Sequence, residues 1–116
     1  MSDETKYPVT FAGAGPGDPE LITVKGMNAL KRADLIIYAG SLVPEAVLCW
    51  KSQDTNTVSS AGMNLEQIIE MIKDNYEDGK KVVRLHTGDP ALYGAIFEQM
   101  RKLDKYDIPY SVIPGV

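Results

Sequence analysis

A length of 116 residues is about that of one domain, and a hydrophobic content of 44% is enough for a packed core. The net charge of −4 argues against general binding to nucleic acid or an anionic membrane, and no apolar run is long enough to span a bilayer. A single cysteine, Cys49, excludes an intrachain disulfide and fits a reducing cytoplasm, while a single histidine, His86, excludes sites that need several imidazoles.

The first half of the chain alternates between strand and helix patterns. The predicted elements are strands over residues 7–14, 34–39 and 57–60 and helices over residues 20–32 and 45–50. Asp18 is placed to cap the first helix, with Pro19 in its first turn, where a missing N–H does no harm. Apolar side chains three residues apart predict the buried stripe of that helix, which consists of Leu21, Val24, Met27 and Leu30.

The second half continues this alternation. It predicts a helix between Asn64 and Gly79, a strand over residues 81–87, a helix over residues 92–105 and a strand over residues 110–113. Asn64 and Gln67 form a capping-box pattern, and Gly79 stops the helix. The predicted buried face of that helix consists of Leu65, Ile68, Ile69, Ile72 and Tyr76. Together the elements predict an α/β domain with a mainly parallel five-stranded sheet and helices on both faces.

A glycine-rich segment, Gly13-Ala-Gly-Pro-Gly-Asp-Pro19, follows the first predicted strand. Its three glycines let the backbone turn sharply and approach a ligand closely. The segment differs from a dinucleotide fingerprint, because Pro16 has no N–H for a phosphate and Asp18 places a negative charge where a pyrophosphate would bind. It is therefore suited to a ligand that is not an anion at that point, such as a sulfonium cofactor or a polarised substrate ring.

A second Gly-Asp-Pro sequence, Gly88–Pro90, follows the fourth predicted strand. In open parallel sheets, ligands bind at the carboxyl ends of strands, near the point where the strand order reverses. We therefore expect Gly17–Pro19 and Gly88–Pro90 to lie at the same edge of the sheet. The alternative interpretation is that Asp18 and Asp89 only cap the helices that follow them.

Four separately spaced motifs carry a likeness to a known family: Gly13–Thr23, Ala33-Asp34 before a strand ending in Tyr38, Thr87–Pro90 and Pro114–Val116. They resemble the tetrapyrrole methylases, which are S-adenosylmethionine-dependent enzymes of cobalamin and sirohaem synthesis. The resemblance covers essentially the whole chain but only the first of the family's two α/β domains. It implies that residues 1–116 form an N-terminal domain, and the end of the chain directly after a strand predicts a second domain beyond Val116.

The resemblance also implies ligands and partners. The cofactor would be S-adenosyl-L-methionine, with S-adenosylhomocysteine as product, and the substrate a small tetrapyrrole. Nucleic acid and membranes are not expected as partners. Members of the family are commonly homodimers, and a cytoplasmic location is expected.

Roles for particular positions follow from the same resemblance. The S-adenosylmethionine pocket would be lined by Pro16, Thr87, Gly88, Asp89 and Leu92. The catalytic residue would be Asp18, facing the macrocycle, and the substrate would also meet Gly15, Gly17, Tyr93 and Met63. Asp89 is expected to bind the ribose or the amino-acid end of the cofactor, since a carboxylate at the sulfonium would stabilise the ground state more than the transition state.

Within the family, the segments Tyr38–Pro44 and Arg84–Gly94 most resemble enzymes that methylate precorrin-4 or cobalt-precorrin-4 at C11. Uroporphyrinogen methylases typically carry an aspartate where this chain has Ala39, and a lysine near Ser59–Gly62, where this chain has none. Both departures disfavour uroporphyrinogen as substrate. Another precorrin or uroporphyrinogen methylase is the alternative within the family.

Several single residues allow two interpretations. Precorrins carry many carboxylates whereas this chain is acidic, so local cations such as Arg84 and Lys51 are candidates for docking the substrate. Arg84 also fits a surface position at a strand edge. His86 is interpreted as a hydrogen-bonded core residue, with a catalytic proton carrier as the alternative. Cys49 is interpreted as a core or shell residue rather than a nucleophile.

Two other classes of function compete with a methylase. A nucleotide- or dinucleotide-binding module needs an acidic residue at the end of the second strand to hold a ribose, and Tyr38-Ala39-Gly40 offers none. A structural half-domain with negligible affinity for any ligand is the third possibility.

Overall fold

Five parallel strands form the centre of the molecule. The computed structural model describes residues 5–13, 22–38, 45–86 and 93–113. The strands are β1 (Val9–Gly13), β2 (Leu35–Tyr38), β3 (Asn56–Ser59), β4 (Val82–His86) and β5 (Tyr110–Ile113). Their order across the sheet is β3-β2-β4-β1-β5, and every pair is parallel, which confirms the predicted fold class.

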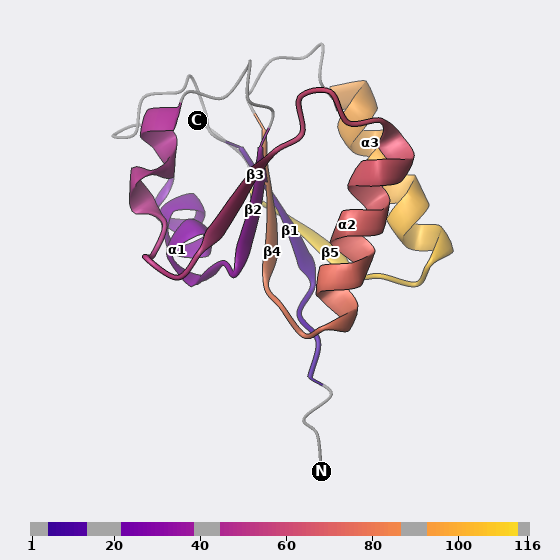
Figure 1. The fold of residues 1–116 in the computed structure, drawn as a ribbon, viewed down its shortest axis with the longest axis horizontal. Coiled ribbons are helices and arrows are strands. Elements are labelled where there is room, and N and C mark those ends of the chain that lie inside the picture. The colour runs from indigo at the N-terminus through magenta and orange to yellow at the C-terminus, as the bar shows by residue number, and fades with distance from the viewer. Residues whose placement is uncertain (1–4, 14–21, 39–44, 87–92, 114–116) are drawn as a thin grey trace.

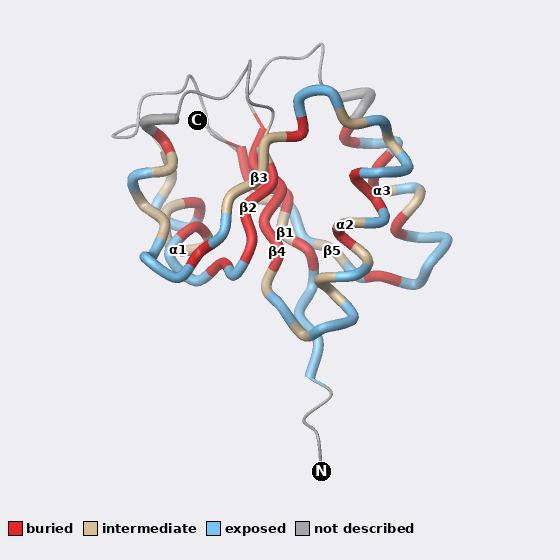
Figure 2. Tube along the Cα trace, viewed as in Figure 1, coloured by how far each residue is buried: buried red, intermediate tan, exposed pale blue. Residues whose placement is uncertain are grey.

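Helices cover both faces of this sheet (Figure 1). They are α1 (Val24–Arg32), the 3₁₀ helix η2 (Glu45–Trp50), α2 (Leu65–Glu77) and α3 (Tyr93–Lys105). Helices α1 and η2 pack on one face, and their cluster with the sheet consists of Ala12, Leu30, Ala33, Ile36, Val47, Val83 and Leu85. Helices α2 and α3 cover the opposite face with a larger apolar cluster, in which Phe11, Ile37 and Ile72 are fully buried. The three inner strands, β2, β4 and β1, are therefore largely buried between two layers, whereas the edge strands β3 and β5 are partly exposed (Figure 2).

The start of α1 differs from the prediction. The helix begins at Val24, and its cap is Thr23, whose Oγ1 accepts a hydrogen bond from the Gly26 amide at 3.0 Å. The predicted cap, Asp18, lies outside the described residues, and Ile22 and Thr23 are not helical. The predicted apolar stripe is also wrong at Val24, which is 69% exposed, while Gly26 is buried. A Cβ at Gly26 would lie 3.0 Å from the Ile22 side chain, so this glycine permits close packing of the helix start.

Both ends of α2 follow from the sequence. The Asn64 side chain accepts from the Gln67 amide at 2.8 Å, and the Gln67 side chain accepts from the Asn64 amide at 2.9 Å, which completes the predicted capping box. At the other end, Gly79 has φ +77 and donates its amide to Tyr76. Lys80 donates to Asn75, so the helix ends in a Schellman motif.

Gly79→Ala is expected to lower the free energy of unfolding by about 1–2 kcal/mol, because a side chain disfavours the left-handed backbone. An added Cβ would also lie 3.1 Å from the Thr5 carbonyl oxygen. The matched control is Gly62→Ala, which has φ +82 and nothing within 4 Å of an added Cβ. Urea unfolding should show a larger loss for Gly79→Ala than for the control, and equal losses would contradict the close approach of Thr5.

No helix in the described part of the chain has both the length and the apolar character needed to cross a membrane.

Candidate functional site

The carboxyl ends of β4 and β1 lie side by side at one edge of the sheet. Gly13, the last residue of β1, is the register partner of His86, the last residue of β4. The chain leaves β1 for α1 on one face and leaves β4 for α3 on the other face (Figure 1). Neighbouring strands whose connections diverge in this way form a topological switch point, where parallel sheets bind their ligands. The strands that precede the two Gly-Asp-Pro segments therefore end at one edge, as predicted.

The described residues at this edge carry no lysine, arginine or carboxylate side chain. The five strands end in Gly13, Tyr38, Ser59, His86 and Ile113. Gly13 and its register partner His86 are both buried at this edge, and His86 is 8% exposed. The polar side chains among these strand ends are those of Tyr38, Ser59 and His86.

A serine fixes the turn at the carboxyl end of β3, a feature that sequence reasoning missed. The Tyr38 carbonyl accepts hydrogen bonds from the Ser60 amide at 2.7 Å and from the Ser60 Oγ at 3.2 Å. Ser59 is the register partner of Tyr38, so the turn over residues 59–62 lies beside the end of β2. A serine directly after a strand is too common a pattern to have pointed to this contact.

Most of the predicted site residues lie outside the described residues. These are Gly15, Pro16, Gly17, Asp18, Thr87, Gly88, Asp89 and Leu92. Tyr93 is the first residue of α3, and its side chain is not described. Met63 follows β3 and packs, half-buried, against the apolar cluster under α2 and α3. Their roles in binding therefore stay predictions.

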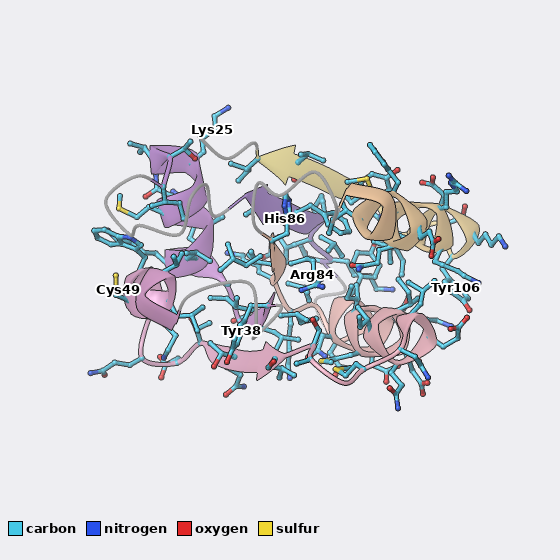
Figure 3. The ribbon with its side chains drawn as sticks, turned by 90° about the horizontal axis from the view of Figure 1, so that it is seen from above. Lys25, Tyr38, Cys49, Arg84, His86 and Tyr106 are labelled. Carbon is cyan, nitrogen blue, oxygen red and sulfur yellow. The ribbon has the colours of Figure 1, made fainter. Side chains whose placement is uncertain are left out.

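The structure corrects the interpretation of three other residues. Arg84 is not a surface residue at a strand edge, because β4 is a central strand and Arg84 is 6% exposed. Lys51 follows η2 and precedes β3, so it lies toward the amino ends of the strands, away from the predicted docking edge. Cys49 is exposed, not a core residue (Figure 3). His86 is buried, in agreement with a core position.

The Arg84 guanidinium lies on the side of β4 that faces α2 and α3 (Figure 3). Its Nε donates to Gln99 Oε1 at 3.2 Å, and its Nη1 donates to the Ile37 carbonyl at 3.3 Å. Burial lowers the pKa of Arg84 to about 10, so the side chain stays charged at neutral pH. In this position it is not available to dock a substrate carboxylate at the surface.

A groove of about 500 Å³ runs between α1 and the sheet, on the side of β1 and β5. Its lining includes Lys25, Arg32 and Lys81. Lys81 precedes β4, so this groove reaches the amino edge of the sheet. Its lining extends to Ile113 at the end of β5 but includes neither Gly13 nor His86, the residues of the switch point.

The strand order defines a parallel α/β domain with a switch point at the carboxyl ends of β4 and β1, which is where domains of this class bind small molecules. The family model of the tetrapyrrole (corrin/porphyrin) methylases matches residues 8–116, and the chain belongs to this family.

Three relatives show how far the similarity extends. Over 108 residues the chain is 56% identical to a cobalt-precorrin-4 C(11)-methyltransferase of Methanocaldococcus jannaschii, covering 93% of this chain and 42% of that protein. The crystal structure of a cobalt precorrin-4 methyltransferase matches with a TM-score of 0.87 and 45% identity, over 94% of this chain and 46% of that one. A uroporphyrin-III C-methyltransferase of Thermus thermophilus, solved with S-adenyl homocysteine, matches with a TM-score of 0.78 and 34% identity, over 95% and 45% of the two chains. The chain thus spans about half the length of the proteins it matches.

Proposed function

We propose that this chain supplies the first domain of an S-adenosylmethionine-dependent methyltransferase that methylates precorrin-4 or cobalt-precorrin-4 at C11. The observation that carries the proposal is the pairing of Gly13 with His86 at the switch point, from which both predicted ligand segments start. The identity of 56% to the cobalt-precorrin-4 enzyme supports the choice of substrate. Because the relatives are about twice as long, the activity is proposed for a protein in which this chain is joined to an equivalent of their remaining half.

The chemistry asks little of individual side chains. S-adenosylmethionine supplies a methyl group that is already activated on a sulfonium sulfur. The protein has to bind the two reactants, align them and exclude water. We infer that residues 87–89, with Pro16 and Leu92, hold the cofactor, and that Asp18, Gly15 and Gly17, with Tyr93 and Met63, face the macrocycle.

The departures at Ala39 and in the turn over residues 59–62 support a corrin precursor over uroporphyrinogen. Ser60 binds the carbonyl of Tyr38, so the turn over residues 59–62 lies beside the end of β2, the strand that Ala39 follows in the sequence. Uroporphyrinogen methylases typically carry an aspartate at the first position and a lysine near the second, whereas this chain offers alanine and serine. We infer that it lacks the acid–base pair that uroporphyrinogen methylation would use.

The test uses the polypeptide encoded by the whole reading frame that contains this chain. It is incubated with methyl-labelled S-adenosylmethionine and, separately, with precorrin-4, cobalt-precorrin-4 or uroporphyrinogen III. The proposal predicts label at C11 of one of the two precorrins, located by NMR, and at least tenfold less label on uroporphyrinogen III. Preferential labelling of uroporphyrinogen III would establish the alternative within the family.

The same preparation distinguishes the other classes. Calorimetric binding of S-adenosylhomocysteine without NADH binding would exclude a dinucleotide-binding module, and no binding of either would leave only a structural role. A homodimer in the cytoplasm is part of the proposal, and light scattering on the same protein tests the dimer.

A further inference from the structure

A buried polar pair joins the two elements on either side of residues 87–92. Arg84 lies two residues before the end of β4, and Gln99 lies in the second turn of α3. Gln99 is 3% exposed and Arg84 is 6% exposed. The hydrogen bond between Arg84 Nε and Gln99 Oε1 therefore joins β4 directly to α3. The second hydrogen bond, from Nη1 to the Ile37 carbonyl, joins the same guanidinium to β2.

Burying a charged guanidinium between a helix and a sheet carries a desolvation cost. The acceptors of the guanidinium are a neutral amide and a backbone carbonyl, and no ion pair joins Arg84 to a carboxylate in the described part of the chain. A buried charge without a charged partner destabilises a fold relative to an apolar side chain of similar size. The register partners of Arg84 on the two neighbouring strands, Phe11 and Ile37, are apolar, so an apolar residue at position 84 would pack against them. The contacts of this arginine in the described part of the chain are directional hydrogen bonds, one to α3 and one to β2.

The pair fixes geometry that apolar packing leaves loose. Apolar contacts allow a helix to shift along its axis over a sheet. Two hydrogen bonds from one planar guanidinium instead fix the position of α3 along its axis relative to β4 and β2. A slip of α3 by one residue would shift it by about 1.5 Å along its axis. Residues 87–92 connect the two braced elements, so such a slip would change the span that they have to bridge.

We propose that Arg84 and Gln99 are positioning residues that brace the connection between β4 and α3 for cofactor binding. The inference rests on the proposed function only in assigning S-adenosylmethionine to residues 87–92. Neither side chain is expected to touch the cofactor. A misplacement of about 1 Å in such a site can reduce activity on the order of 100-fold.

The test compares R84M, Q99M, the double variant and R84K with the unmodified protein from the whole reading frame. The matched control is T55V, which removes another buried hydrogen bond, from Thr55 Oγ1 to the Ala33 carbonyl at 2.7 Å, at the amino edge of the sheet. Urea unfolding records the stability of each variant, so that binding is compared at known folded fractions.

We expect R84M and Q99M each to weaken the binding of S-adenosylhomocysteine about tenfold, and the double variant to be little worse than either, because the two residues act as one unit. R84K should restore part of the affinity, and T55V should lose stability while keeping wild-type affinity. Wild-type affinity in both R84M and Q99M, or the same loss in T55V, would overturn the brace. If one variant does not fold, the other decides.

A second readout does not depend on the cofactor. Amide hydrogen exchange over residues 87–95 should be at least tenfold faster in Q99M than in T55V, without any ligand. Equal exchange rates would overturn the brace even if the cofactor binds. Failure of the unmodified protein to bind S-adenosylhomocysteine would instead count against the proposed function and leave the exchange experiment to judge the brace.

Discussion

Asp89→Ala is expected to weaken the binding of S-adenosylhomocysteine about 10- to 100-fold in the polypeptide from the whole reading frame. The physical reason is the loss of a charge-assisted hydrogen bond to the ribose or to the amino-acid end, a bond worth about 1.5–3 kcal/mol. Asp89 follows β4 by three residues and so belongs to the segment that starts at the switch point. Isothermal titration calorimetry measures the effect directly.

The matched control for this variant is Asp54→Ala. Asp54 is an exposed aspartate in the turn before β3, at the opposite edge of the sheet. Its removal changes the net charge by the same amount, so any general electrostatic effect on binding is shared. Unchanged affinity in Asp89→Ala, or an equal loss in Asp54→Ala, would reject the role of Asp89 in the pocket and favour the interpretation that it only caps α3.

Phe11→Ala is expected to lower the free energy of unfolding by about 3–5 kcal/mol, the usual loss for a large buried aromatic side chain. Phe11 is 0% exposed in the central strand β1, and its ring meets Tyr110 edge-on at 5.9 Å between centroids. It packs in the apolar cluster under α2 and α3, two residues before Gly13. Loss of this side chain should therefore loosen the strand that leads to the switch point.

The control for the core is Val112→Ala. Val112 lies on the neighbouring strand β5, is the register partner of Phe11 and is 53% exposed. Its truncation should cost less than about 1 kcal/mol, since most of the side chain is already in contact with water. Urea unfolding that found similar losses for both variants would contradict the placement of β1 as an inner strand and β5 as an edge strand.

The fold was predictable where short-range signals and burial agree. The strands are apolar runs, so they were predicted to within about two residues, and Asn64, Gln67 and Gly79 marked both ends of α2 correctly. The start of α1 was not predicted correctly. The chain holds two good capping residues, Asp18 and Thr23, and the sequence alone does not show which of them caps the helix. The close packing of Gly26 against Ile22 and Thr23 at the helix start depends on the three-dimensional positions of these residues, which the sequence does not show.

For the candidate site, the sequence predicted which strands end together, whereas the binding roles of the residues that follow them stay predictions. The repeated Gly-Asp-Pro sequence and the rule for parallel sheets predicted one common edge, and the pairing of Gly13 with His86 agrees. The burial of Arg84 was missed, because an arginine in a strand is usually exposed and its partner, Gln99, lies 15 residues away on another element. The contact of Ser60 with Tyr38 was missed for the same reason, since it joins residues 22 apart.

A crystal structure of the whole polypeptide with S-adenosylhomocysteine tests most directly whether the methyl donor binds at the carboxyl ends of β4 and β1. We predict electron density for the ligand above Gly13 and His86, in contact with residues 87–89 and Pro16. Density in the groove between α1 and β5, lined by Lys25, Arg32 and Lys81, would contradict it.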